Sequence, residues 1–163
     1  MLDPVRVEIS FEKFARAVVK KAKANLTRGG HRISSKLYNS LDNWKVDVSK
    51  NGSVSLTFGY EDYGEFQDKG VKGAANFKCH WMKEFTPYKF RDKMPPRKGI
   101  KDFIKAKGID APAFVIQRSV YEKGIPQTLF FTKPFRDQFK ELPETILGAF
   151  GNDVESFLNN INK

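Results

Sequence analysis

Four acidic side chains lie within eight residues of one another in the middle of the sequence. They are Glu61, Asp62, Glu65 and Asp68, and Lys69 follows them directly. Carboxylates can hold Mg²⁺ and a lysine can stabilise charge that develops on a phosphate, so the chemistry to consider is metal-dependent cleavage of nucleic acid. A common nuclease arrangement places an acid two residues before such a lysine, and that spacing occurs nowhere in the sequence. Acids in this place can equally supply negative charge at the start of a helix, so a nuclease is the less favoured reading.

Other catalytic templates find no match in the sequence. A phosphate-binding loop needs glycines at set offsets before a helix, and Gly70 and Gly73 do not have that spacing. Cys79 and His80 are neighbours, so on an extended chain they point to opposite sides and make a poor metal chelate. No Gly-x-Ser-x-Gly segment is present for a hydrolytic triad. We therefore expect a protein without enzymatic activity, without a cofactor and without a metal site.

The formal net charge of +10 is concentrated in one segment. Residues 69–107 hold twelve Lys and Arg against three acids, a net charge of +9, whereas residues 136–163 carry a net charge of −2. Such a segment can face nucleic acid or an acidic protein surface, or it can be a solvated basic surface.

Aromatic and basic residues are interleaved within this segment. The aromatic residues are Phe77, Trp81, Phe85, Tyr88 and Phe90, and the basic residues among them are Lys78, Lys83, Lys89 and Arg91. This composition suits base stacking combined with phosphate contact. It equally suits anchors at a protein interface, or packing of the segment against the core. No sequence signature of a nucleic-acid-binding module decides between these readings.

Length and composition indicate one globular domain, residues 1–163, with enough apolar side chains for a core. The single Cys79 excludes an intramolecular disulfide and favours a reducing compartment. The sequence has no apolar run of membrane-spanning length and no apolar stretch typical of a secretory signal near its start. These observations predict a soluble intracellular protein that does not enter a membrane.

The first half of the chain carries clear periodic patterns. Apolar residues from Phe11 to Leu26 recur at helical spacing after Ser10, a plausible N-cap, and predict an amphipathic helix that ends at residues 28–30. Residues 33–41 predict a short second helix. Alternating apolar residues at 44–48 and 54–58 flank Asn51-Gly52 and predict a two-stranded antiparallel hairpin with one face buried.

The second half is less regular. Residues 70–96 predict a long basic loop that ends at a pair of prolines, and residues 99–108 predict a helix stopped by Gly108. Asp110 can cap a further helix, with Phe114 and Val115 facing inward and Gly124 at its end. Residues 128–131 predict a strand or extended segment.

Two helices are expected near the C-terminus. Phe135 and Phe139 lie four residues apart in a short helix, and an apolar stripe from Ile146 to Ile161 predicts a last amphipathic helix that starts near Pro143. The expected fold class is α+β. A small antiparallel sheet that includes the hairpin packs against N-terminal and C-terminal amphipathic helices, and a long basic loop projects from it.

Three short segments, in their order along the chain, resemble the tail-completion or head–tail joining proteins of tailed bacteriophages, which are also called neck or minor tail proteins. In that family a (G/S)xLxxS(I/L) segment precedes a hairpin, a YxxFxExG-like step follows it, and an RPFLRPA-like motif lies before the final helix. The counterparts here are SKLYNSL at 35–41, YGEFQDKG at 63–70 and LFFTKPF at 129–135. The resemblance spans residues 10–158. Two departures are the length of residues 71–96 and the lack of the first arginine, with Lys133 near where a base is expected.

The resemblance implies a non-enzymatic virion structural protein that is assembled in the host cytoplasm and forms a homo-oligomeric ring at the head–tail junction. Its expected partners are the connector, or portal-side, proteins and the tail proteins, and the basic loop is expected to reach an acidic neighbour or DNA in the channel. The candidate interface residues are Tyr63, Phe66, Lys69, Lys72, Trp81, Phe85, Tyr88 and Arg97. The alternative reading is a basic nucleic-acid-binding protein of a phage or mobile element.

Overall fold

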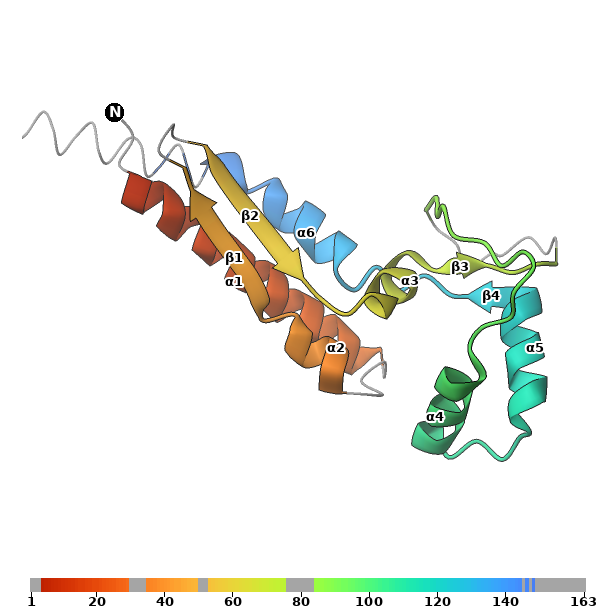
Figure 1. Cartoon of the computed structure of the whole chain (residues 1–163). Helices are drawn as coiled ribbons and strands as arrows, with labels where there is room; N and C mark the ends of the chain where they lie inside the picture. The colour runs from red at the N-terminus through yellow and green to blue at the C-terminus, as the bar shows by residue number, and fades with distance from the viewer. Residues whose placement is uncertain are drawn as a thin grey trace, which may run out of the picture.

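The computed structural model describes residues 4–29, 35–49, 53–75 and 84–144, together with positions 146 and 148. In chain order its elements are α1 (Pro4–Arg28), α2 (Ser35–Ser40), β1 (Asn43–Val48), β2 (Val54–Gly59), α3 (Tyr63–Lys69), β3 (Val71–Lys72), α4 (Arg97–Lys107), α5 (Ala113–Lys123), β4 (Gly124–Ile125) and α6 (Thr132–Phe139). The fold class is α+β, as the sequence predicted. Figure 1 shows an elongated molecule in which α1, α2, β1, β2 and α6 form a body at one end, while α4 and α5 lie at the other.

Helix α1 turns one face to the core of the body and the opposite face to solvent. Its buried apolar residues are Phe14, Ala15, Val18, Val19, Ala22 and Leu26. Lys13, Lys20 and Lys21 are exposed. The helix begins at Pro4, where a proline is tolerated in a first turn. The prediction that Ser10 caps this helix is therefore wrong, because Ser10 lies inside it and its hydroxyl donates to the Arg6 carbonyl at 3.0 Å.

Strands β1 and β2 form the predicted hairpin. Trp44 lies opposite Phe58. Along both strands, half-buried residues alternate with exposed ones. The amide of Ser49 donates to the carbonyl of Ser53 at 2.8 Å, which closes the ladder next to the turn. Asn51 and Gly52, the expected turn residues, lie outside the described part of the chain.

Two adjoining apolar clusters join the hairpin to α1 and α6. The first is formed by residues of α1 together with Leu37, Leu41 and Phe130, and the second by Phe14, Val18 and Leu142. Half-buried aromatic side chains connect the two clusters, and the rings of Phe58 and Phe131 meet edge to face at 5.2 Å. The body thus contains most of the buried apolar side chains that the structure describes.

Helix α3 occupies the stretch after the hairpin, where the acids left open the start of a helix but no helix bounds were predicted. Only Phe66 and Tyr63 are large apolar residues in its seven positions, too few to establish a helical period. A buried acid ties it to the body. The carboxylate of Asp68 accepts hydrogen bonds from the amide of Phe131 at 2.8 Å and from the amide and hydroxyl of Thr132, at the start of α6.

Beyond α3, the described residues of 70–125 form what we call the arm. Within the predicted long loop, residues 70–96, the two-residue strand β3 pairs with β4, and a bridge joins Lys72 to Lys89. Helices α4 and α5 pack side by side at its far end, as Figure 1 shows. Gly108 ends α4 in the left-handed conformation, with a φ of 60°, as predicted.

Three further predictions in the second half are wrong. Pro112, not Asp110, precedes α5 as its N-cap residue. Phe114 and Val115 are exposed by 52% and 54% rather than facing inward. Residues 128–131 form no strand; Leu129 has a φ of 51°, and Phe130 turns into the core. The predicted last helix, 143–161, lies largely outside the described residues, although Ile146 packs on the second cluster.

Candidate functional site

Five of the predicted interface residues come together where the arm leaves the body. Phe66, Lys69, Lys72, Phe85 and Tyr88, which we call the arm-base cluster, are drawn from α3, β3 and the segment that runs beside β3. The rings of Phe66 and Tyr88 meet edge to face at 4.7 Å, and the ammonium of Lys72 lies 5.4 Å from the centre of the Phe85 ring. Phe85 is 83% exposed, so its ring is presented to solvent rather than used in packing.

Glu65 makes polar contacts with two members of this cluster, Lys69 and Tyr88. The Lys69 ammonium donates to the Glu65 carboxylate at 2.7 Å, one helical turn away. Hydrogen bonds first from Lys69 and then from Tyr88 hold the pKa of Glu65 below its ordinary value. The same contacts raise the pKa of Lys69 and the pKa of the Tyr88 hydroxyl. Glu65 is therefore an anion engaged with its neighbours and is not set up as a catalytic base.

Backbone hydrogen bonds hold residues 88–90 against β3. The amide of Lys72 donates to the carbonyl of Tyr88, and the amide of Phe90 donates to the carbonyl of Lys72, each at 2.9 Å. The hydroxyl of Thr86, which is buried, donates to the carbonyl of Gly70 at 2.8 Å. These contacts give the exposed side chains of the cluster a fixed backbone.

Side chains from distant parts of the chain join the arm to the body. Gln127 accepts a hydrogen bond from the amide of Glu84 at 3.0 Å and donates to the carbonyl of Lys69 at 3.2 Å. Arg136 of α6 donates to both carboxylate oxygens of Glu84, at 2.7 and 2.8 Å. This two-point contact holds the pKa of Glu84 below its ordinary value of 4.5. The arm is therefore attached to the body by specific polar contacts as well as by the chain itself.

The other three predicted interface residues do not belong to the cluster. Tyr63 is 42% exposed and its hydroxyl accepts a hydrogen bond from the amide of Leu37, so it connects α3 to α2. Arg97 lies at the start of α4, further along the arm, and is exposed. Trp81 lies outside the described residues.

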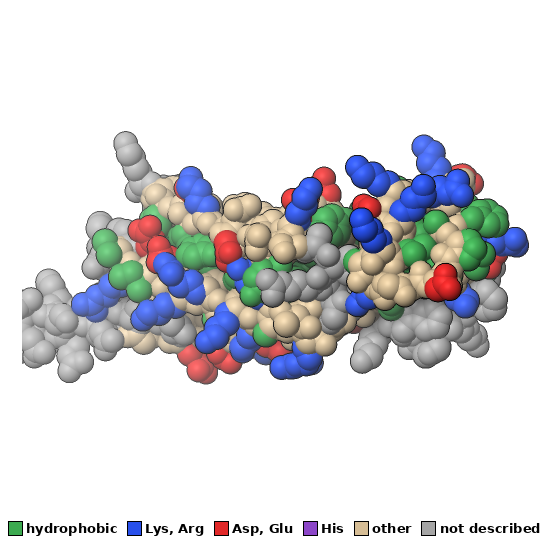
Figure 2. Space-filling model, turned by 90° about the horizontal axis from the view of Figure 1, so that it is seen from below, with side chains coloured by type: hydrophobic (Ala, Val, Ile, Leu, Met, Phe, Trp, Pro, Cys, Tyr) green, Lys and Arg blue, Asp and Glu red, His purple; other side chains and the backbone are tan. Residues whose placement is uncertain are grey.

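Exposed apolar residues that were not predicted as interface residues lie farther out on the arm. Phe114, Val115 and Met94 are each exposed by more than 40%. Figure 2 shows hydrophobic side chains surrounded by lysine and arginine at this end of the molecule. The helical spacing of Phe114 and its neighbours indicated a buried face, and nothing in the sequence indicated that Phe114 and Val115 would be exposed.

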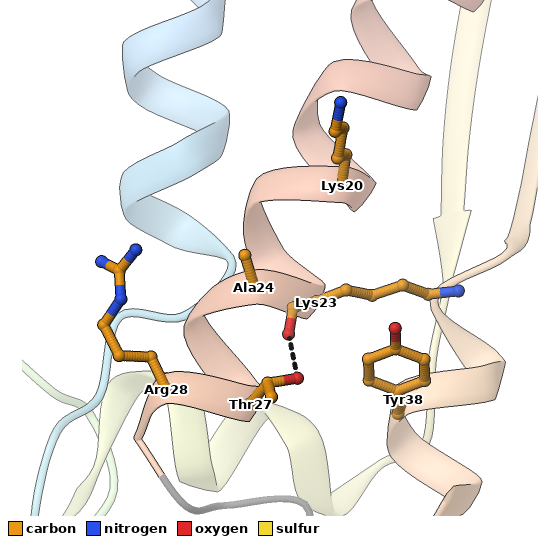
Figure 3. A pocket seen from close by; sticks show the side chains of 6 residues that line it. All are labelled: Lys20, Lys23, Ala24, Thr27, Arg28 and Tyr38. Carbon is orange, nitrogen blue, oxygen red and sulfur yellow. Dashed lines mark hydrogen bonds between the residues drawn. The ribbon is translucent and has the colours of Figure 1, made fainter.

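A shallow open depression lies on the surface of α1. It is lined by Lys20, Lys23, Ala24, Thr27, Arg28 and Tyr38. Figure 3 shows Lys23 extending past the ring of Tyr38 and Arg28 directed to the other side of the helix. Lys23 is paired with both oxygens of Asp42 at 2.6 Å, and its ammonium lies 4.7 Å from the centre of the Tyr38 ring. Its charge is thus already compensated, and the depression has no converging polar groups.

Two of the four acids that raised the question of a nuclease have other roles. Asp68 caps α6, and Glu65 is bound by Lys69. Within the described residues, no group of three or more Cys, His, Asp and Glu side chains is placed to hold a metal ion. In the same part of the chain, no helix is both long and apolar enough to cross a membrane.

Comparison with known proteins identifies no relative of this chain. No protein-family model, curated protein or solved structure matches it.

Proposed function

We propose that this chain is a virion structural protein of a tailed phage, which forms a ring at the head–tail junction and joins the connector to the tail. The observation that carries the proposal is the arm, which projects from a well-packed body and presents large apolar side chains to solvent. Phe85 is 83% exposed, and Phe114 and Val115 are more than half exposed. Exposed groups of this size, next to charged ones, are typical of surfaces that other protein chains cover.

The shape of the molecule supports a ring in preference to a two-fold dimer. A closed ring needs two different surfaces on each subunit, so that the same contact repeats around the axis. The arm and the body are separate surfaces at opposite ends of the molecule (Figure 1). An arm that reaches onto the body of the next subunit would make such a head-to-tail contact, with the arm-base cluster near its origin.

The order of sequence motifs supports the location in the virion. The three segments that resemble the head–tail joining proteins fall on α2, on α3 and on the turn into α6. Leu37 of the first segment packs against the third segment's Phe130 in the core of the body. The amide of Leu37 also donates to Tyr63 of the second segment, so the three segments form one connected structural unit.

The proposal is tested by electron microscopy of virions, or of connector components co-expressed with this chain, with the chain carrying a label. We expect a closed ring of labelled copies at the head–tail junction. Absence of the chain from particles would contradict the proposal. A monomeric state of the isolated protein would not, because such a ring can depend on the assembling particle.

A further inference from the structure

Basic side chains without ion-pair partners are dense along one part of the arm. Residues 89–107 contain eight Lys and Arg and two acids, a net charge of +6. Seven of these bases form no ion pair among the described residues: Lys89, Arg91, Lys93, Arg97, Lys98, Lys101 and Lys105. All seven are exposed. By contrast, Lys23, Lys69 and Arg136, nearer the body, are each neutralised by a carboxylate.

Helix α4 arranges four of these bases on one face. At about 100° per residue, Arg97, Lys98, Lys101 and Lys105 fall within an arc of about 100°. Ile100, the buried residue of α4, lies outside this arc, about 60° from Arg97 and about 110° from the centre of the arc. The four cations therefore form a continuous, exposed basic face, with Arg97 at the edge nearest Ile100.

The segment before α4 supplies a second row. Lys89, Arg91 and Lys93 alternate along a chain that is not helical, and such alternation places side chains on a common side where the chain is extended. Two contacts hold this segment against α5. The hydroxyl of Tyr121 donates to the carbonyl of Arg91, and the side chain of Gln117 donates to the carbonyl of Pro95 at 2.7 Å. Helix α5 therefore contacts both α4 and the segment that contains the second row.

We infer that these two rows bind the phosphate backbone of duplex DNA, without regard to base sequence. With a rise of about 1.5 Å per residue, the four cations of α4 span about 12 Å, or one charge per roughly 3–4 Å. A single DNA strand carries one phosphate per about 3.4 Å of axis, which is the same density. On an acidic protein surface the carboxylates are interspersed with cations, so the density of negative charge is lower than along a DNA strand. The inference does not depend on the ring, because a single copy carries both rows.

The test measures binding of the purified full chain to a fluorescent 30-base-pair duplex of random sequence. We expect a dissociation constant of about 10⁻⁴–10⁻⁶ M near physiological salt, and a steep linear fall of log affinity with log salt. The variant Lys98→Gln/Lys101→Gln/Lys105→Gln should flatten that slope by about 3, since each lost phosphate contact removes about 1. Lys89→Gln/Arg91→Gln/Lys93→Gln tests the second row in the same way.

The matched control is Lys13→Gln/Lys20→Gln/Lys21→Gln, which removes three exposed lysines from one face of α1 and so changes the net charge equally. We expect it to leave most of the salt dependence in place. Equal effects of the α1 and α4 variants would overturn the inference, because they would mean attraction by net charge alone. Three other outcomes would also overturn it. They are absence of duplex binding, equal binding of a polyglutamate of matched charge, and tighter binding of single strands that Phe85→Ser abolishes.

Discussion

Asp68 lies at the end of α3, and its carboxylate receives three donors from Phe131 and Thr132. It is 1% exposed, so no water can replace these hydrogen bonds. The acid that the sequence offered as a metal ligand therefore acts as a side-chain cap for a helix that lies more than sixty residues away.

We predict that Asp68→Ala lowers the free energy of unfolding by about 2–3 kcal/mol, because it leaves buried amide donors unpaired and removes hydrogen bonds to a charged acceptor. Asp68→Asn keeps one acceptor oxygen and should lose less than half as much. Urea denaturation monitored by circular dichroism measures both. An Asp68→Ala protein as stable as the parent would show that the cap contributes nothing.

The ion pair between Glu84 and Arg136 makes stability depend on pH. Folding lowers the pKa of Glu84, so the pair stabilises the protein above pH 4.5 and the contribution is lost as the pH falls through the lowered pKa. We predict that Glu84→Gln loses less stability than the parent between about pH 5 and pH 3. Because Arg136 is more than half exposed, solvent screens the ion pair and the difference should be small. Denaturation midpoints over this pH range measure this difference.

The control is Glu61→Gln, at an exposed acid with no ion pair among the described residues. It should behave like the parent.

At the scale of elements, the backbone around β3 lies very close to the backbone around β4. A side chain on Gly73 would collide with the carbonyl of Glu122, and one on Gly124 would collide with the carbonyl of Val71. Gly124 also has a φ of 92°, which only glycine adopts readily. The pairing of the arm therefore depends on the absence of side chains at these positions.

We predict that Gly73→Ala destabilises the protein by about 1–3 kcal/mol, because the backbone of α5's last turn must shift to make room. Gly99→Ala is the matched control. It lies in α4 with nothing within 4 Å of the new methyl group, and alanine should stabilise the helix by up to about 1 kcal/mol. Thermal unfolding of the two variants should therefore move in opposite directions. A Gly73→Ala protein with an unchanged midpoint would mean that β3 and β4 do not need this close approach.

At the scale of the whole molecule, the body and the arm are built differently. The body contains two clusters of buried apolar residues, whereas the buried apolar residues that the structure describes within the arm are Val71 and Ile100. An arm with so small a core keeps Phe114 and Val115 exposed, and it gains most by contact with another molecule. This difference is the physical basis for the proposal that the arm serves assembly, while the body supplies most of the stability.

We predict that Phe114→Ser/Val115→Ser leaves the free energy of unfolding within about 0.5 kcal/mol of the parent, because more than half of each side chain is exposed and neither belongs to a buried cluster. The same variant should lower incorporation into particles by about tenfold, the cost of losing an interface anchor worth about 1.4 kcal/mol. Ile9→Ser, which removes an apolar side chain that is 45% exposed on the body, is the control and should be incorporated normally. Quantitative labelling of particles made in complemented cells measures both. Normal incorporation of the double variant would exclude this end of the arm as an assembly surface.

The sequence by itself determined the elements whose signals are local. The alternation around Trp44 and Phe58 specified the hairpin, because a period of two leaves one register that buries one face. The apolar spacing of α1 specified its buried face, and Gly108 specified the end of α4. The sequence offered eight candidate interface residues as one set, and the fold brings five of them together: Phe66, Lys69, Lys72, Phe85 and Tyr88.

Only the tertiary structure decided the rest, because the deciding contacts join residues far apart in the chain. Asp68 became a cap once Phe131 and Thr132 were placed beside it, and residues 128–131 became a turn instead of a strand. The strands β3 and β4 are two residues each and have no period to read; their pairing depends on Gly73 and Gly124 fitting against a distant backbone. Phe114 and Val115 carry a pattern that suits a buried helix face. They are more than half exposed, because none of the described neighbours of α5 covers them fully.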